Sequence, residues 1–258
     1  MSLTDIIGQE KAVAMLTGIL ERQRLASSYI FSGESGIGKK LTAINFAKAL
    51  NCLNPVASDK FQATDDKNSL LPAVTRHSLR ITDLDACDRC EACLKIEAGS
   101  HPDLKLISPE DRQIKIDEIR LVDEALSFRP FEGRKKVVIV DDADAMNIAA
   151  ANAFLKTLEE PPEDSVIILI SSRPDRLPAT IRSRCSRVNF VTLSLEACRK
   201  VLRGKVPDEE LEALAGLSMG KPGLALSSDL KEEIAWFSGL LRAMLNAEKD
   251  SWSSREDM

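Results

Sequence analysis

Short apolar runs alternate with longer amphipathic segments along the chain up to about residue 192. The runs are too short for helices, and turn or charged residues follow them, which is typical of buried strands in a parallel sheet. They predict strands at 29–32, 104–107, 137–141, 166–171 and 188–191. Apolar residues at helical spacing predict helices at 39–50, 116–128 and 148–158. The pattern therefore predicts an α/β fold with a five-stranded parallel sheet covered by helices on both faces.

Beyond Thr192 the pattern contains helices without strands. It predicts short helices at 195–202, 209–218 and 221–226, and a further helix that begins at Lys231 and runs to about 247. The tail from Asp250 is polar. We therefore expect a first domain at 1–192, a small helical lid domain at 193–228 and a third segment at 229–258.

A polar segment interrupts the first domain between Cys52 and Cys93. It includes Ser58, Asp59, Thr64, Asp65, Asp66, Lys67, Asn68 and Ser69, which predict an exposed loop. A loop of this length inside a compact domain needs either a function or an anchor.

Clustered cysteines offer that anchor. Cys87, Cys90 and Cys93 follow the spacing C-x-x-C-x-x-C, and Cys52 ends the preceding helix. Four thiolates satisfy a tetrahedral zinc ion and leave no open position, so the cluster predicts a structural zinc site rather than a catalytic one. The alternatives are reduced thiols without a metal, or His101 as the fourth ligand in place of Cys52. Cys185 and Cys198 are isolated and are interpreted as small buried side chains.

Composition and charge exclude several classes of protein. The chain has 258 residues, a net charge of −5 and 4% aromatic residues, so it cannot coat nucleic acid or anionic lipid by bulk charge and has few rings for stacking on bases. Its longest apolar runs are far shorter than the ~20 residues that span a bilayer. The first residues lack a basic region followed by an apolar stretch, so we expect a cytoplasmic chain without membrane contact.

The stretch GESGIGKK places Gly33, Gly36, Gly38 and Lys39 between a predicted strand and a predicted helix. In that context the pattern indicates a phosphate-binding loop, whose amides and lysine hold phosphate groups. The next residue is Lys40, although phosphate loops carry a Ser or Thr there to hold magnesium. An ammonium group cannot coordinate magnesium, which demands oxygen ligands.

Two further segments carry candidate chemistry. The third strand ends at Asp141, a position suited to organising magnesium, and Asp142 follows where ATPases of this type usually have Glu. The segment 171–187 holds five arginines at positions 173, 176, 182, 184 and 187. It is either a solvated basic loop or the source of an arginine finger directed at another subunit's phosphates.

Together these motifs resemble the clamp-loader subunits of bacterial DNA polymerase III, which are of the AAA+ class, and especially their delta prime type. The similarity includes most of the chain, from DIIGQEKAVAML through GESGIGKK, CDRCEAC, AGSHPD, VVIVDDADAMN, AFLKTLEEPP and LPATIRSRC to GKPGLAL. It implies an AAA+ phosphate-loop domain with an inserted zinc module at 52–93. The stretch between Cys52 and Cys87 is longer than the compact spacing expected from the family.

The resemblance also implies roles for single residues. Arg184 lies in the S-R-C motif and corresponds to an arginine finger that acts in trans on ATP in a neighbouring motor subunit. Pro222 stands where active motor subunits carry a phosphate-sensing Arg. Lys40, Asp142 and Pro222 thus alter three catalytic elements, as is common in delta prime subunits, which serve as a rigid stator.

The implied partners are the motor subunits and the delta subunit in a hetero-pentamer, with the sliding clamp and primed DNA reached through the assembly. The family also has a C-terminal helical collar, whereas this chain stops soon after Lys231 begins a helix. Either the sequence is part of a longer protein, in which case we expect weak assembly, or its collar is reduced.

Three alternatives to a non-catalytic stator stay open. The chain could be a self-sufficient AAA+ ATPase, perhaps a motor-type subunit of the same loader. It could bind ATP or ADP without hydrolysis, because the backbone cradle and Lys39 are present. More distantly, it could be a zinc-dependent nucleic-acid-binding module, which the acidic charge disfavours.

Overall fold

The computed structural model describes residues 1–57 and 84–227 of the chain. They form two compact units. The first contains Met1–Glu34 and Gly38–Val191, and the second contains Ser35–Ile37 and the chain from Thr192 onward. The predicted loop at 58–69, the predicted helix from Lys231 and the polar tail lie outside the described residues.

A five-stranded parallel sheet forms the centre of the first unit, as the hydrophobic pattern predicted. Its strand order is β4-β5-β6-β1-β7, and neighbouring strands are parallel throughout. The strands are β1 (Ser28–Ser32), β4 (Leu104–Ile107), β5 (Lys136–Val140), β6 (Ser165–Ser171) and β7 (Ser186–Asn189). Burial follows position in the sheet, because β1 and β6 are buried along their whole length whereas the edge strand β4 is largely exposed.

The predicted last strand was placed wrongly by two residues. The sequence indicated 188–191, but β7 is Ser186–Asn189 because its backbone pairs with Tyr29–Ser32 of β1. The apolar Val191, which suggested the later boundary, is exposed. Backbone pairing rather than side-chain hydropathy sets the limits of this strand.

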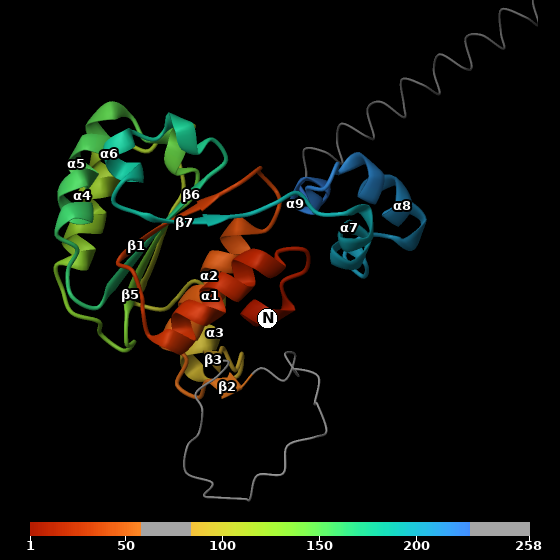
Figure 1. The fold of residues 1–258 in the computed structure, drawn as a ribbon, viewed down its shortest axis with the longest axis horizontal. Helices are drawn as coiled ribbons and strands as arrows, with labels where there is room; N and C mark the ends of the chain where they lie inside the picture. The colour runs from red at the N-terminus through yellow and green to blue at the C-terminus, as the bar shows by residue number, and fades with distance from the viewer. Residues whose placement is uncertain (58–83, 228–258) are drawn as a thin grey trace, which may run out of the picture. The chain divides into compact units, whose positions relative to one another are not determined.

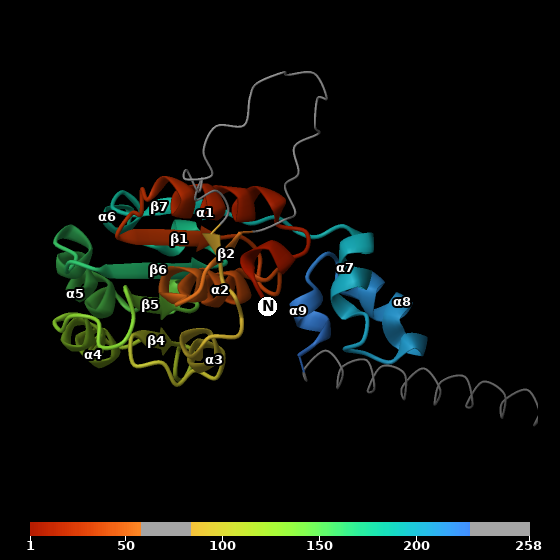
Figure 2. The same cartoon turned by 90° about the horizontal axis from the view of Figure 1, so that it is seen from below.

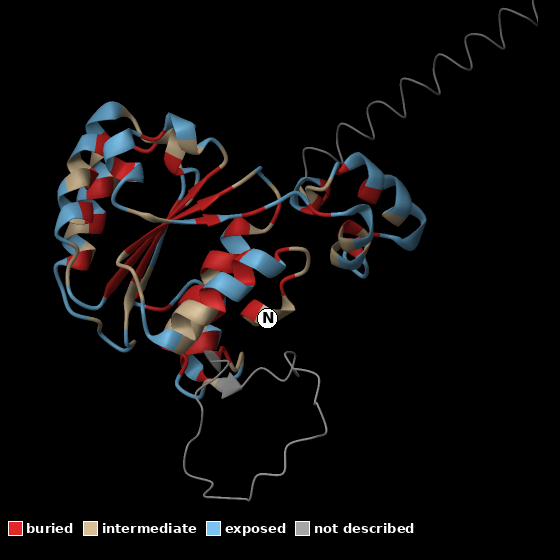
Figure 3. Ribbon diagram, in the orientation of Figure 1, coloured by how far each residue is buried: buried red, intermediate tan, exposed pale blue. Residues whose placement is uncertain are grey.

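Helices cover both faces of the sheet (Figure 1). On one face lie α4 (Ile116–Leu126) and α5 (Ile148–Glu159), whose apolar residues share a buried cluster with β5 and β6. On the other lie α1 (Glu10–Arg22) and α2 (Lys39–Asn51), and Phe46 of α2 packs edge-on against Tyr29 of β1. Figure 2 shows the same layers from below, and Figure 3 shows buried residues concentrated in the sheet and on the inner faces of the helices.

The helix predictions within the described residues are confirmed to within two residues, but α1, α3 (Glu91–Glu97) and the short α6 (Ala179–Arg182) were missed. Helix α1 was not predicted, although Ala12, Val13, Leu16 and Thr17 form its buried face at helical spacing. Helix α3 was also missed, and it carries Cys93 in what had been interpreted as a turn-rich segment. Helix α4 ends at Leu126 rather than at residue 128, and Phe128 beyond it is largely exposed.

The second unit contains helices α7 (Leu195–Leu202), α8 (Asp208–Leu217) and α9 (Pro222–Ala225) in its described part. Cys198, Leu202, Leu214 and Ala225 are buried there, which agrees with a small helical domain. Within residues 1–57 and 84–227, no helix is long and apolar enough to cross a membrane. The exact domain limits stay predictions.

Two substitutions in α5 test the assigned packing. Phe154 is fully buried, whereas Ile148 on the same helix is 82% exposed. We expect Phe154→Ala to lower the free energy of unfolding by ~3–5 kcal/mol, and Ile148→Ala to change it by less than ~0.5 kcal/mol. Urea denaturation followed by circular dichroism measures both. Equal losses from the two variants would contradict the packing described here.

Candidate nucleotide site, metal site and arginine segment

The glycine loop joins the carboxyl end of β1 to the first turn of α2. Gly36 and Gly38 have φ values of 76° and 99°, a left-handed conformation that favours glycine. Gly38 is the residue before the helix, and Lys39 is its first residue. The sequence therefore forms a strand, loop and helix in the order that phosphate binding requires.

Lys39 is bound to its own loop. Its Nζ donates to the carbonyl oxygen of Gly33 at 2.6 Å and to that of Glu34. Burial lowers the pKa of Lys39, and the carboxylates of Asp142 and Asp141 oppose that shift. A phosphate group would have to displace these carbonyl contacts to reach the amine.

Lys40 makes an ion pair with the acidic residue at the end of β5. Its Nζ lies 3.1 Å from Oδ2 of Asp141. In a phosphate loop with Ser or Thr at this position, the hydroxyl and the carboxylate would both face a magnesium ion. In this chain the ammonium group of Lys40 stands where the hydroxyl would be, and it neutralises the carboxylate of Asp141. The pair is partly exposed, so it adds little to stability.

Asp142 and Asp144 complete an acidic cluster beyond β5. Asp142 has a left-handed backbone with φ of 45°. Burial raises the pKa of its carboxyl group, and the nearby charges of Asp141 and Asp144 raise it further. Burial and the neighbouring negative charges thus disfavour the ionised form of Asp142, whose side chain is also one methylene shorter than that of Glu.

Asp144, which the sequence did not indicate as a site residue, binds the hydroxyl group of Ser171. Its carboxylate accepts from the hydroxyl of Ser171 at 2.7 Å and lies 3.4 Å from Nε of Arg173. Ser171 ends β6 beside the glycine loop, and the amide of Gly33 donates to its carbonyl oxygen at 3.3 Å. The hydroxyl group of Ser171 is thus already hydrogen-bonded to Asp144. The sequence signal that could have indicated Asp144 was its place as the third acid of the motif DDAD.

The tip of the glycine loop belongs to the second unit. The amide of Gly223 in α9 donates to the carbonyl oxygen of Gly36 at 2.8 Å. A Cβ atom at Gly223 would lie 2.8 Å from that same oxygen, so only glycine fits the contact. Pro222, the first residue of α9, is buried and offers no charged group to a phosphate.

The four predicted cysteine ligands converge. The sulfur atoms of Cys52, Cys87, Cys90 and Cys93 all lie within 4.8 Å of one another. Cys52 caps the end of α2, Cys90 precedes α3 and Cys93 lies within it, so two helices fix three of the sulfurs. This set could hold a metal such as zinc, for which four thiolates are a sufficient ligand set.

His101 is not part of this group. Its Nδ1 accepts a hydrogen bond from the amide of Asp103 at 3.1 Å. The His101 side chain is buried, and it does not belong to the group of four close cysteines. The long separation between Cys52 and Cys87 had made His101 an alternative fourth ligand. A histidine ligand is not needed, because the end of α2 lies next to α3 and so places Cys52 beside the other three cysteines.

The cysteine cluster favours ionised sulfur at one position. Burial acts to raise the pKa of Cys90, but hydrogen bonds from the amides of Cys93 and Leu53 outweigh it and lower the pKa to about 6. Burial raises the pKa of Cys93. A metal ion would offset the second effect, since it stabilises thiolates directly.

A buried lysine ties this module to the domain. Lys48 of α2 is almost fully buried, and its Nζ lies 3.1 Å from Asp88 and also pairs with Glu97 of α3. On the other side Asp85 accepts hydrogen bonds from the amides of Leu3 and Thr4, each at 3.0 Å. These contacts join the cysteine cluster to α2 and to the start of the chain. Helix α2 itself begins at the glycine loop and ends at Cys52.

Arg184 lies just beyond α6 (Ala179–Arg182), on the other side of the domain from the glycine loop. It precedes β7 by two residues, so it lies at the amino edge of the sheet, whereas Gly33 follows the carboxyl end of β1. A strand of five residues separates these edges by about 15 Å. Arg184 thus cannot serve the phosphate loop of its own chain.

Three of the other four arginines of the segment make different contacts. Arg173 pairs with Asp144, Arg182 pairs with Asp175 at 3.0 Å, and Nε of Arg187 donates to the hydroxyl of Ser32 at 3.1 Å. The segment is therefore not a uniform basic loop, because its members are directed to separate partners.

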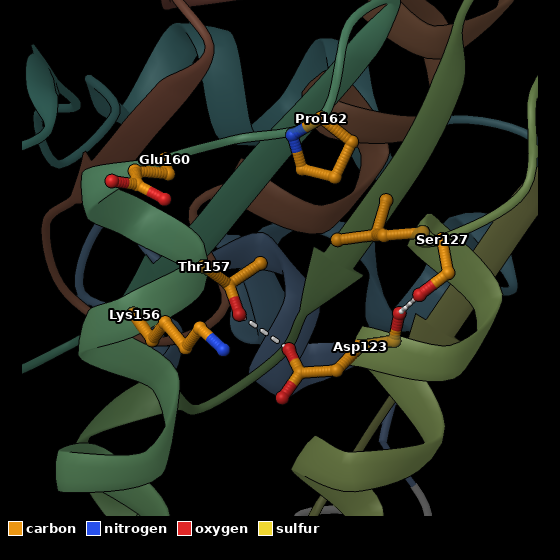
Figure 4. A pocket seen from close by; sticks show the side chains of 7 residues that line it. Asp123, Ser127, Lys156, Thr157, Glu160 and Pro162 are labelled. Atoms are coloured by element: carbon orange, nitrogen blue, oxygen red, sulfur yellow. Dashed lines mark hydrogen bonds between the residues drawn. The ribbon is translucent and has the colours of Figure 1, made fainter.

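A small pocket of about 210 Å³ opens between the ends of α4 and α5 (Figure 4). Asp123 accepts a hydrogen bond from the hydroxyl of Thr157 there, and Lys156 and Glu160 lie along its wall. A second pocket, of about 470 Å³, is lined mainly by apolar residues of α1 and α2. Both lie away from the glycine loop.

Metal analysis tests the cysteine site. We expect the purified chain to contain about one zinc ion per molecule and Cys90→Ser to retain much less, because three thiolates leave the tetrahedral site incomplete. Cys185→Ala removes a thiol outside the group and should leave the zinc content unchanged. Elemental analysis by mass spectrometry gives the ratio. Full zinc content in Cys90→Ser would contradict the assignment.

Comparisons with known proteins agree with these features. The family model described as DNA polymerase III, delta subunit, matches residues 8–69 and 66–194. The DNA polymerase III subunit delta' of Pseudomonas aeruginosa is 36% identical over 207 residues, which are 78% of this chain and 55% of that protein. The delta' subunit of Bacillus subtilis is 34% identical over 73% of this chain and 49% of its own length. The chain thus spans about half the length of these relatives.

Other relatives are related subunits or share only the fold. The tau subunit of Bacillus subtilis is 31% identical over 91% of this chain and 38% of its own length. A gamma subunit-related protein of Thermotoga maritima has a TM-score of 0.51 at 26% identity, over 81% of this chain and 57% of its own. The RuvB branch migration motor of Thermotoga maritima has a TM-score of 0.51 at 14% identity, over 85% and 60%, which shows the AAA+ fold alone. From the family match and the delta' relatives, the chain belongs to the DNA polymerase III delta' family of bacterial clamp-loader subunits.

Proposed function

We propose that the chain is a non-catalytic stator of the clamp loader that supplies Arg184 in trans to ATP bound by a motor subunit. The observation that carries the proposal is the position of Arg184, at the edge of the sheet opposite its own phosphate loop. A guanidinium group there can stabilise phosphate charge only in a neighbouring molecule. In this role the chain would assemble with motor subunits and the delta subunit in a cytoplasmic hetero-pentamer and help load the sliding clamp onto primed DNA.

The internal pairing of the phosphate loop supports the non-catalytic part of the proposal. Lys40 neutralises Asp141, Lys39 is bonded to loop carbonyls, and Ser171 is bonded to Asp144. Each of these side chains already has a partner within the chain. Pro222 supplies no cation where the family's motor subunits carry an Arg.

A self-sufficient or motor-type ATPase is the second candidate. The similarity to tau, which extends over 91% of this chain, favours it, as does the intact backbone of the glycine loop. Binding of ATP or ADP without hydrolysis is an intermediate case. The ion pair between Lys40 and Asp141 separates these candidates, because magnesium binding requires that it open.

Lys40→Thr tests how the ion pair acts on the loop. The variant frees Asp141 and supplies a hydroxyl oxygen, so we expect magnesium-dependent affinity for ATP to rise by about tenfold, equivalent to ~1.4 kcal/mol. Hydrolysis should stay absent because Asp142 and Pro222 are unchanged. Calorimetry with and without magnesium measures the effect. Lys40→Ala, which frees Asp141 without adding a ligand, is the control. Equal affinities of wild type and Lys40→Thr would argue against the blocking role.

Arg184→Ala tests the trans role. We expect the ATPase activity that the chain adds to the motor subunits to fall to background, since arginine fingers contribute about 10³–10⁵-fold at the site they serve. Arg184→Lys should recover little, because a lysine lacks the planar fork. Arg182→Ala, two residues away, is the matched control. Size-exclusion chromatography verifies assembly, and full activity of an assembled Arg184→Ala loader would refute the proposal.

A further inference from the structure

Arg184 is held from two different elements. Its Nη2 lies 2.7 Å from Oε1 of Glu159, and its Nη1 donates to the carbonyl oxygen of Thr180 at 2.9 Å. A weaker contact joins Nη1 to the hydroxyl of Ser183 at 3.4 Å. Contacts to both terminal nitrogens fix the plane of the guanidinium group. Its five N–H donors exceed these contacts, so donors remain for an anion.

Buried residues anchor both of the segments that carry this ion pair. Ile181, three residues before Arg184, is fully buried in the core, and Cys185 packs against the same cluster. On the other side Leu158 is buried and anchors the last turn of α5. Two prolines follow Glu160 and restrict the chain as it leaves the helix. The distance between Glu159 and Arg184 is therefore set by the fold.

Glu159 is a poor choice for local helix stability. It is the last residue of α5, where the unpaired carbonyl groups carry partial negative charge and disfavour a carboxylate. Glu160 follows directly and adds to the negative charge. The ion pair with Arg184 is also partly exposed, with side-chain exposures of 50% for Glu159 and 35% for Arg184. Such pairs add little stability, so orientation of the arginine explains the glutamate better than stability does.

We propose that Glu159 is a positioning residue that holds the guanidinium group of Arg184 in the orientation that reaches the partner's ATP. The inference rests on the proposed function of Arg184. An arginine without this contact would sample many rotamers, and each encounter with the phosphates would have to order it again. Glu159 does not contact ATP and acts only through Arg184.

A double-mutant cycle tests the proposal in the loader assembled from the full chain and its motor subunits. The variants are Glu159→Ala, Arg184→Ala and the double variant. The ATPase rate is measured while the chain is titrated, which separates the rate at saturation from the concentration needed for assembly. We expect Glu159→Ala to lower the saturating stimulation by about tenfold, within the range known for misplaced catalytic groups. The half-saturating concentration should not change.

In the Arg184→Ala background, loss of Glu159 should have no further effect, because the two residues act as a unit. Glu159→Gln keeps an acceptor oxygen and should lose less activity than Glu159→Ala. Glu160→Ala, the adjacent acid at the same helix end, is the matched control and should behave as wild type.

The possible outcomes separate the two proposals. If Arg184→Ala lowers the stimulation but Glu159→Ala leaves it unchanged, raises it, or acts additively with Arg184→Ala, the positioning role is refuted and the trans role stands. If Arg184→Ala has no effect in an assembled loader, both are refuted. A rise in the half-saturating concentration alone would show that Glu159 serves assembly, and it would also refute the positioning role.

Discussion

The parallel pairing of β6 with β1 on one side and β5 on the other is the constraint on which the structure depends. All seven residues of β6 are buried, so its register cannot shift without exposing the core. This register aligns the carboxyl ends of the three strands, where the glycine loop, Asp141 and Ser171 meet. It also aligns their amino ends, near which the ion pair of Glu159 and Arg184 lies. The same backbone pairing thus assembles one site and keeps Arg184 out of it.

At the carboxyl edge, the residues of a nucleotide site are present but are paired with one another. Lys40 takes the carboxylate that would face magnesium, and the amine of Lys39 is bonded to loop carbonyls. The tip of the loop is bonded to Gly223. Such contacts hold the loop in one shape from within the chain, as the proposed stator role requires. Helix α2 extends that rigidity to the cysteine cluster, since it begins at Lys39 and ends beside Cys52.

Hydropathy was sufficient for most of the fold because the central strands β1, β5 and β6 are buried on both faces and therefore appear as continuous apolar runs. It failed at β7, where Ser186 and Arg187 pair through their backbone although their side chains are polar. The convergence of Cys52 with the other cysteines could only be suggested, because it depends on where the end of α2 lies in space. The contacts of Lys40 with Asp141 and of Arg184 with Glu159 join residues far apart in the sequence. No local pattern indicates them.

ATP hydrolysis by the purified chain, alone and after addition to the proposed motor subunits, tests the stator role most directly. That role predicts no magnesium-dependent hydrolysis by the chain alone and a faster rate when it joins the motor subunits. Hydrolysis by the chain alone, at a rate that the motor subunits do not increase, would contradict it and would identify the chain as a self-sufficient ATPase.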